Sequence, residues 1–138
     1  MQIIEVKNQL VSTIALIDDE NKILVGKRPV GKVFENLWEF PGGKVKKNET
    51  VEQALIRETK EEINIDLSNN CIAPLAFSTY KSENINIVIL LFISRKWNLD
   101  PISKVHSELR WVKANNLNKY NMPPANKFLV ASLQDLLL

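Results

Sequence analysis

The segment from Leu37 to Ile63 constrains the fold more than any other part of this chain of 138 residues. Leu37 to Phe40 is typical of a short strand, and Pro41-Gly42-Gly43 ends that strand in a tight turn. Thr50-Val51-Glu52-Gln53 has the spacing of a capping box, which predicts a helix from about Thr50 to Ile63. A strand, a tight turn and a capped helix in close succession indicate a fold that mixes strands and helices.

Apolar and β-branched residues predict further strands on both sides of that helix. Leu10–Ile17 and Lys22–Arg28 are expected to form a hairpin, because turn-forming residues lie between them. Later predicted strands cover Ile72–Lys81, Ile85–Trp97 and Leu109–Val112. After Pro123-Pro124, the spacing of the apolar residues predicts a C-terminal amphipathic helix through Phe128, Leu129, Leu133, Leu136 and Leu137. The expected fold is α/β (α+β), an α/β/α sandwich with a mixed β-sheet, in one domain covering residues 1–138.

Composition and charge exclude several other classes of protein. Hydrophobic residues make up 45% and charged residues 25% of the chain, as in ordinary soluble globular proteins. The single Cys71 cannot form an internal disulfide and Met1–Glu5 lacks the features of a secretory signal, so a cytoplasmic location is expected. The longest apolar run, Ile87–Ile93, is too short to span a membrane. A net charge of +2 is too small to hold duplex nucleic acid, so a nucleotide is the more reasonable partner.

The predicted helix ends in an unusual cluster of acidic residues. Glu58, Glu61 and Glu62 share one face and lie close to the helix C-terminus. That end of a helix is itself partly negative, so the carboxylates oppose the helix dipole and repel one another. A hard divalent cation such as Mg²⁺ or Mn²⁺ would offset the repulsion. A solvated helix end, with Lys60 as local compensation, is the alternative.

The spacing of charged residues around this cluster resembles the Nudix box of the Nudix hydrolase family. Gly43 is followed by five residues and Glu49, then by seven residues and Arg57-Glu58, then by two residues and Glu61-Glu62. The resemblance covers residues 43–65 and keeps every charged position of the box.

Two positions depart from the pattern of the box. Thr59 stands where an aliphatic residue is usual, and Asn64 replaces the closing glycine. Because asparagine tolerates the left-handed backbone conformation, the turn after the helix is expected to survive. Thr59 retains a methyl group for packing.

The family resemblance implies hydrolysis of a nucleoside diphosphate linked to another group, with Mg²⁺ as cofactor and Mn²⁺ as a possible substitute. The implied metal ligands are Glu58, Glu61 and Glu62 and the carbonyl of Gly42 or Gly43, and Glu39 is a further contributor to the metal or phosphate region. Arg57 is expected to pair with Glu61 or Glu49 and so to orient the cluster.

The general base is an open question in the sequence. In relatives it is a glutamate of the box or a glutamate on a later loop, often just before a histidine that precedes a tryptophan by five residues. His106 and Trp111 keep that spacing, but Val105 occupies the glutamate position. Glu58 or Glu62 is therefore the favoured base, Glu108 is a second candidate, and His106 is expected to be a hydrogen-bonded structural residue.

Two further segments, Leu37–Lys44 and Pro123-Pro124-Ala125-Asn126, resemble the MutT branch of the family, the bacterial 8-oxo-dGTP pyrophosphohydrolases. That resemblance implies that the Asn126 amide reads the oxidised base and that Phe40 packs near the purine, whereas capping of the last helix is the alternative role for Asn126. Lys27 and Arg28 are candidate partners of the phosphates, or else form a solvated strand end.

The reaction that the resemblance implies converts 8-oxo-dGTP and water into 8-oxo-dGMP and pyrophosphate, which prevents mutation. CTP, dCTP or a broad set of dNTPs are alternative substrates. A catalytically inactive nucleotide sensor or protein-binding module is the alternative of another class. The expected partner is a small-molecule nucleoside triphosphate, with no duplex nucleic acid and no membrane, and the expected oligomeric state is a monomer or weak dimer.

Overall fold

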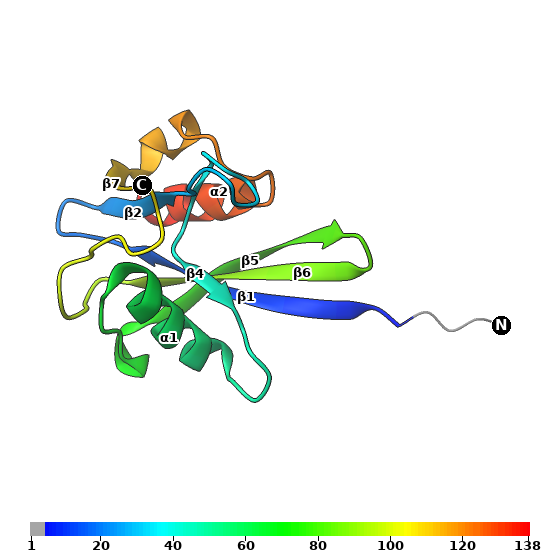
Figure 1. The fold of residues 1–138 in the computed structure, drawn as a ribbon. Coiled ribbons are helices and arrows are strands. Elements are labelled where there is room, and N and C mark those ends of the chain that lie inside the picture. Colours follow the sequence, from blue (N-terminus) through cyan, green and yellow to red (C-terminus); the bar gives the residue numbers. More distant parts are fainter. Residues whose placement is uncertain (1–4) are drawn as a thin grey trace.

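The computed structural model describes residues 5–138, so most of the segment considered for a secretory signal lies outside the described residues. Helices α1 (Val51–Ile63) and α2 (Asn126–Leu136) lie on opposite sides of a mixed β-sheet (Figure 1). The predicted α/β/α sandwich is therefore confirmed. No helix within residues 5–138 has both the length and the apolar character needed to cross a membrane.

The strands form two sheets. The larger has the order β4-β1-β6-β5, and its strands are β4 (Gly42–Lys44), β1 (Lys7–Leu16), β6 (Ile85–Ser94) and β5 (Ala73–Ser82). Strands β1 and β6 are parallel, and the other neighbours are antiparallel. The smaller sheet is antiparallel, with β3 (Trp38–Glu39), β2 (Lys22–Lys27) and β7 (Glu108–Lys113). Two 3₁₀ helices complete the chain, η1 (Asn69–Cys71) and η2 (Ala114–Lys119).

The predicted hairpin of β1 and β2 is wrong, although the turn between them forms. Asn21 N–H donates to the Asp18 carbonyl at 3.0 Å, and Lys22 N–H donates to the Asp18 carboxylate at 2.8 Å. Beyond the turn, one bridge between Ile17 and Ile23 joins the two strands, and each then enters a different sheet. The apolar residues of β1 point to both faces, which suits a central strand flanked by β4 and β6 rather than one arm of an isolated hairpin.

Alternation along β1 gives the molecule a core on each side of the large sheet. Ile14 and Leu16 pack with Leu55 and Ile63 beneath α1. Ala15 and Ile17 pack on the other side with Leu129 and other residues that α2 covers. Ile14, Ala15 and Leu16 of β1 and Ile17, which follows it, are at most 1% exposed.

Helix α1 begins and ends as its sequence predicts. Gln53 N–H donates to Thr50 Oγ1 at 3.0 Å, and Thr50 N–H donates to Gln53 Oε1 at 2.9 Å, so both bonds of the capping box are present. Asn64 adopts the left-handed conformation with φ 60° and ψ 31°, and its N–H donates to the Lys60 carbonyl at 3.2 Å. Asparagine therefore supplies the turn that a glycine usually makes at this position.

The predicted C-terminal helix forms as α2, but it buries only part of the apolar set that predicted it. Leu129, Val130 and Leu133 are buried, but Phe128 is 63% exposed and Leu136 is 44% exposed. The predicted face was therefore partly wrong, because packing against β5 and η2 decides which face of the helix is covered.

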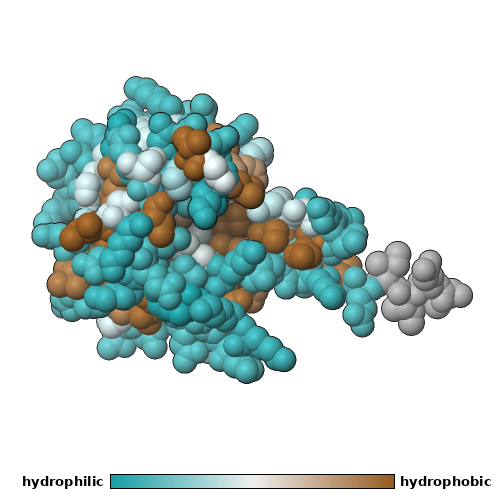
Figure 2. Space-filling model, in the orientation of Figure 1, coloured by the Kyte–Doolittle hydropathy of each residue, from teal (hydrophilic) through white to brown (hydrophobic). Residues whose placement is uncertain are grey.

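Most of the surface is hydrophilic, and hydrophobic residues gather near the point where the strands leave the body of the molecule (Figure 2). The far ends of β1, β5 and β6 project beyond both helices (Figure 1). Leu10, Phe77 and Ile85 are exposed large hydrophobic residues of these strands.

Candidate active site

Arg57 connects the carboxylates near the C-terminal end of α1. Its Nε and Nη2 donate to the Glu49 carboxylate at 2.7 and 2.8 Å, and its Nη1 donates to Glu58 at 2.8 Å. A longer bond of 3.4 Å reaches Glu61, and Nη2 also donates to the Lys44 carbonyl at 3.1 Å. The guanidinium lowers the pKa of the Glu49 carboxyl to about 2. The predicted ion pairing of Arg57 is confirmed.

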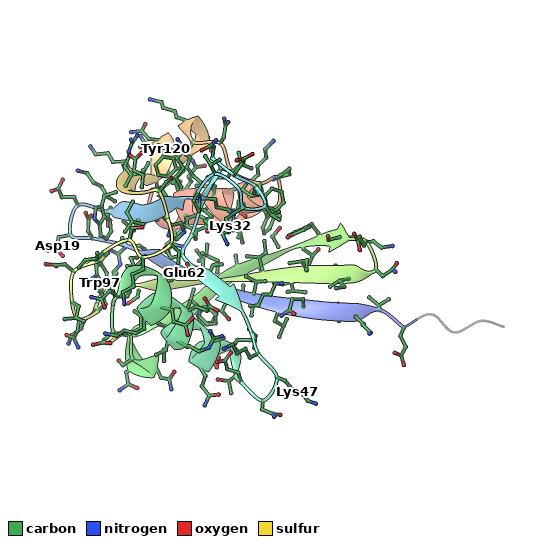
Figure 3. All side chains as sticks on the ribbon, in the orientation of Figure 1. Asp19, Lys32, Lys47, Glu62, Trp97 and Tyr120 are labelled. Carbon is green, nitrogen blue, oxygen red and sulfur yellow. The ribbon has the colours of Figure 1, made fainter. Side chains whose placement is uncertain are left out.

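Glu62 is half-buried between α1 and the three-stranded sheet, near the centre of the molecule (Figure 3). Its Oε1 accepts a hydrogen bond from Gly42 N–H at 3.1 Å. Burial raises the pKa of the Glu62 carboxyl to about 7, and the negative charges of Glu39 and Glu58 add to the rise. A carboxyl with such a pKa can gain or lose a proton near neutral pH.

The raised pKa of Glu62 predicts a pH-dependent stability. Between the ordinary pKa of 4.5 and about 7, the folded protein keeps a proton that the unfolded chain releases. Raising the pH through this window therefore lowers the free energy of unfolding, by a maximum on the order of 3 kcal/mol. Urea unfolding in EDTA at a series of pH values should show this decline in the wild type and a smaller one in Glu62→Gln.

A matched control for this prediction is Glu61→Gln, because the Glu61 side chain is 57% exposed. That variant should keep the pH dependence of the wild type. Equal slopes in the wild type and in Glu62→Gln would mean that Glu62 does not retain its proton.

Glu39 at the end of β3 accepts hydrogen bonds from two side chains. Arg28 Nη1 donates to its two carboxylate oxygens at 3.1 and 3.2 Å. His106 Nε2 lies 2.9 Å from Glu39 Oε2, and the His106 side chain is only 1% exposed. The prediction that His106 is a hydrogen-bonded residue is confirmed, and Arg28 contacts a carboxylate of the protein.

Glu39, Glu62 and His106 form a compact group of possible metal-binding side chains. One ligand atom from each lies within 4.8 Å of the other two, and no other such group of three occurs among residues 5–138. Of the three helix glutamates expected to converge, only Glu62 belongs to this group, because Glu58 and Glu61 turn towards Arg57.

The glycine turn lies against the helix glutamates. A Cβ atom on Gly43 would lie 2.3 Å from the carboxylate carbon of Glu58, so this position has no room for a side chain. Gly42 bonds to Glu62 through its N–H. The turn therefore contacts both inner carboxylates of α1.

The structure separates Lys27 and Glu108 from this group. Lys27 is paired with Trp38 in β3 and with Glu108 in β7, whereas Gly26 is paired with Glu39. Directly opposed residues point to the same face of a sheet and successive residues to opposite faces. Lys27 and Glu108 consequently lie on the other face of the small sheet, where Glu108 forms an ion pair with Arg110.

Phe40 and Asn126 are both buried on the α2 side. Phe40 is 3% exposed and belongs to the core beneath α2. Asn126 is 6% exposed, and its Nδ2 lies 4.0 Å from Met122 Sδ. The N-cap of α2 is Ala125 and no side chain caps this helix, so the capping role considered for Asn126 is wrong.

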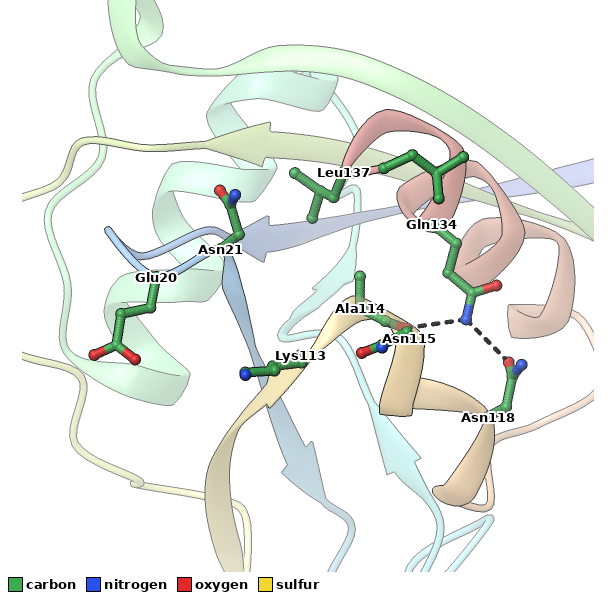
Figure 4. Close-up of a pocket in the computed structure, with 9 residues that line it drawn as sticks. Glu20, Asn21, Lys113, Ala114, Asn115, Asn118, Gln134 and Leu137 are labelled. Carbon is green, nitrogen blue, oxygen red and sulfur yellow. Dashed lines mark hydrogen bonds between the residues drawn. The ribbon is translucent and has the colours of Figure 1, made fainter.

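Two surface pockets lie away from the group of Glu39, Glu62 and His106. One, of about 570 Å³, lies between the β1–β2 turn, η2 and the end of α2, and Gln134 bonds to Ala114 and Asn118 there (Figure 4). A second, of about 560 Å³, lies on the Lys27 face of the small sheet. The residues that line it are Lys27, Asn36, Trp38, Glu108, Arg110, Asn116, Lys119, Tyr120 and Asn121.

The contact between Glu39 and His106 was missed by reasoning from the sequence. A signal for it exists in Gly26, a glycine inside a strand, which often marks a close approach. A Cβ atom at Gly26 would lie 2.6 Å from the His106 ring. The glycine therefore makes room for a side chain that follows it by 80 residues in the chain.

Known proteins resemble this chain in sequence and in fold. Residues 7–133 match the model of the NUDIX domain. The chain is 31% identical over 124 residues to the 8-oxo-dGTP diphosphatase of Escherichia coli K12. The alignment covers 86% of this chain and 91% of that protein. A stretch of 52 residues is 46% identical to the CTP pyrophosphohydrolase of the same organism and covers 38% of each. The E. coli ORF135 structure superposes with a TM-score of 0.84 at 26% identity, over 94% of this chain and 91% of that one.

Proposed function

The chain belongs to the NUDIX domain family, and from this premise we propose that it is a Mg²⁺-dependent nucleoside triphosphate pyrophosphohydrolase that prefers 8-oxo-dGTP. It adds water across the anhydride between the α- and β-phosphates and releases 8-oxo-dGMP and pyrophosphate. The observation that carries the proposal is the half-buried Glu62, which bonds to the glycine turn and lies beside Glu39. The resemblance to an 8-oxo-dGTP diphosphatase over most of the chain supports the choice of nucleotide.

The donor set fits a hard divalent cation. Carboxylate oxygens of Glu39, Glu58, Glu61 and Glu62 and the carbonyls of Gly42 and Gly43 are the ligand types that Mg²⁺ and Mn²⁺ prefer. Two like-charged carboxylates held together and partly shielded from water, as Glu39 and Glu62 are, gain from a cation between them. When bound, the cation would neutralise charge on the polyphosphate and lower the pKa of a coordinated water.

Arg57 and Glu62 have separate roles in the proposed reaction. Arg57 holds Glu58 by one hydrogen bond and Glu49 by two, so the carboxylates keep a fixed orientation. Glu62, half-buried beside Glu39 and held by the glycine turn, is the proposed acceptor of the proton from the attacking water. Its bond from Gly42 N–H keeps the acceptor in place.

Glu62 and Glu58 are better candidates for the base than Glu108. Val105, at the position of the usual loop glutamate, is 47% exposed. Glu108 is engaged by Arg110 on the other face of the small sheet. The base is therefore best sought within the box.

A pyrophosphate-release assay with Mg²⁺ on 8-oxo-dGTP, dGTP, CTP and dCTP tests the proposed function. The highest kcat/KM is expected for 8-oxo-dGTP. A higher value for CTP or dCTP would favour the second candidate, which the 46% identity to a CTP pyrophosphohydrolase over 52 residues supports. No turnover of any nucleotide would refute the enzyme and leave a sensor or binding module.

Replacing Asn126 with alanine should reduce the preference for 8-oxo-dGTP over dGTP by about tenfold and leave turnover of dGTP within about threefold of the wild type. The amide of Asn126 offers the donor and acceptor atoms that a purine edge requires, and alanine has neither. Because Asn126 does not cap α2, the substitution removes no capping bond from the helix. Steady-state kinetics on the two nucleotides check the ratio. Lys127→Ala, at an exposed neighbouring position, should not alter it. An unchanged ratio in Asn126→Ala would remove Asn126 from base recognition.

A further inference from the structure

We propose that His106 is a positioning residue whose Nε2–H holds the Glu39 carboxylate beside Glu62, so that both carboxylates face one divalent cation. This inference rests on the proposed function and adds to it a residue from outside the box. His106 itself does not bind the cation. Its role is to fix the carboxylate that does.

The loop that carries His106 is attached to the two elements that form the site. Ile102 N–H and Lys104 N–H donate to the carbonyls of Ile63 and Glu62, both at 2.9 Å. Ser107 N–H donates to the Lys27 carbonyl at 3.0 Å. These bonds tie one end of the loop to α1 and the other end to β2. His106 lies between the two attachments, so its ring has a fixed position relative to Glu62.

The small sheet leaves space for the His106 ring. Gly26 is the β2 partner of Glu39, and a Cβ on Gly26 would lie 2.6 Å from two carbon atoms of the ring. The ring therefore packs over the one position of β2 that lacks a side chain. In that place Nε2 reaches Glu39 Oε2 at 2.9 Å.

The surroundings of the other ring nitrogen, Nδ1, indicate which tautomer His106 adopts. Nδ1 is buried, and no hydrogen-bond partner for it is found within the described chain. If Nε2 bound a cation, the neutral ring would carry its proton on Nδ1, and a buried N–H without an acceptor is costly. The tautomer with a lone pair on Nδ1 leaves no buried N–H without an acceptor, so its free energy is lower. The geometry therefore favours a proton on Nε2, which donates to Glu39, although Nε2 lies close enough to Glu62 to suggest a third ligand.

Arg28 is the second side chain that binds the Glu39 carboxylate. Its Nη1 donates to both carboxylate oxygens, in addition to the bond between His106 and Oε2. The Glu39 carboxylate is therefore held by hydrogen bonds from two side chains, Arg28 and His106. Groups that orient a ligand in this way commonly change metal affinity or activity by about 10–100-fold when removed.

Nuclear magnetic resonance can test the tautomer directly, because His106 is the only histidine of the chain. Long-range ¹H–¹⁵N spectra of the untagged, metal-free protein should show a protonated Nε2 and an unprotonated Nδ1. The Nε2 signal should stay in the protonated range when Mg²⁺ is added. A proton on Nδ1, or loss of the Nε2 proton on addition of the metal, would overturn the proposal.

Two substitutions separate positioning from packing. His106→Gln places an amide N–H near the position of Nε2, whereas His106→Leu fills similar space without a donor. By electron paramagnetic resonance, Mn²⁺ alone should bind about tenfold more weakly to His106→Leu and within about threefold of the wild type to His106→Gln. The Mg²⁺ concentration for half-maximal turnover should follow the same order, with nucleotide KM at saturating Mg²⁺ nearly unchanged.

Val105→Ala in the same loop, at a position that is 47% exposed, is the matched control and should behave as the wild type. Thermal unfolding of every variant reports folding separately. Equal Mn²⁺ affinity in His106→Leu and the wild type would contradict the proposal, as would a folded His106→Gln that is as impaired as His106→Leu. A wild type without turnover would refute the proposed function alone, because the resonance and Mn²⁺ measurements need no nucleotide.

Discussion

Glu58→Gln is expected to lower kcat at least about 100-fold while the protein stays folded. Glutamine keeps the shape of the side chain and an oxygen that can accept from Arg57 Nη1, now 2.8 Å from Glu58. It removes the negative charge beside Gly43, where a ligand or base is needed. Arg57 retains its two bonds to Glu49, so the loss of stability should be small.

The measurement is kcat and KM by pyrophosphate release at saturating Mg²⁺, with thermal unfolding by circular dichroism. Glu52→Gln is the control, since it makes the same chemical change in the first turn of α1, at the other end of the helix. That variant should keep the wild-type rate. An active Glu58→Gln enzyme would place the chemistry elsewhere on the molecule.

Gly42→Ala is expected to cost about 4 kcal/mol of stability, the largest loss among the substitutions considered. Gly42 has φ +150°, and a Cβ there would lie 2.0 Å from the Ser12 carbonyl oxygen and 2.7 Å from Thr13 Cα. Those atoms belong to the backbone of the central strand β1 and cannot move aside. Backbone strain and overpacking each contribute about 1–3 kcal/mol.

Urea unfolding in EDTA measures this loss, and Gly31→Ala is its control. Gly31 also has a positive φ, +90°, but nothing lies within 4 Å of an added Cβ. The control should therefore show the strain alone, about 1–2 kcal/mol. Equal losses in the two variants would mean that the contact with β1 does not limit this position.

Features that depend on neighbours along one helix could be predicted from the sequence. The capping box at Thr50, the left-handed end at Asn64 and the pairing of Arg57 with Glu49 all form as expected. Their geometry follows from the fixed rise and rotation of the helix and from short connections, so spacing alone suffices. The identity of the family followed from the same spacing, because the box is a local pattern.

Features that join distant segments were decided by the tertiary structure. Glu39 and His106 are 67 residues apart, and Lys27 lies on the face away from Glu39 because the register pairs Gly26, and not Lys27, with Glu39. The sequence predicted a hairpin of β1 and β2, yet β1 pairs with β4 and β6. Local patterns establish which residues can form a strand or a helix. The packing of the whole core determines which strands pair and which side chains then come into contact. Residue spacing within one short segment therefore cannot predict these contacts.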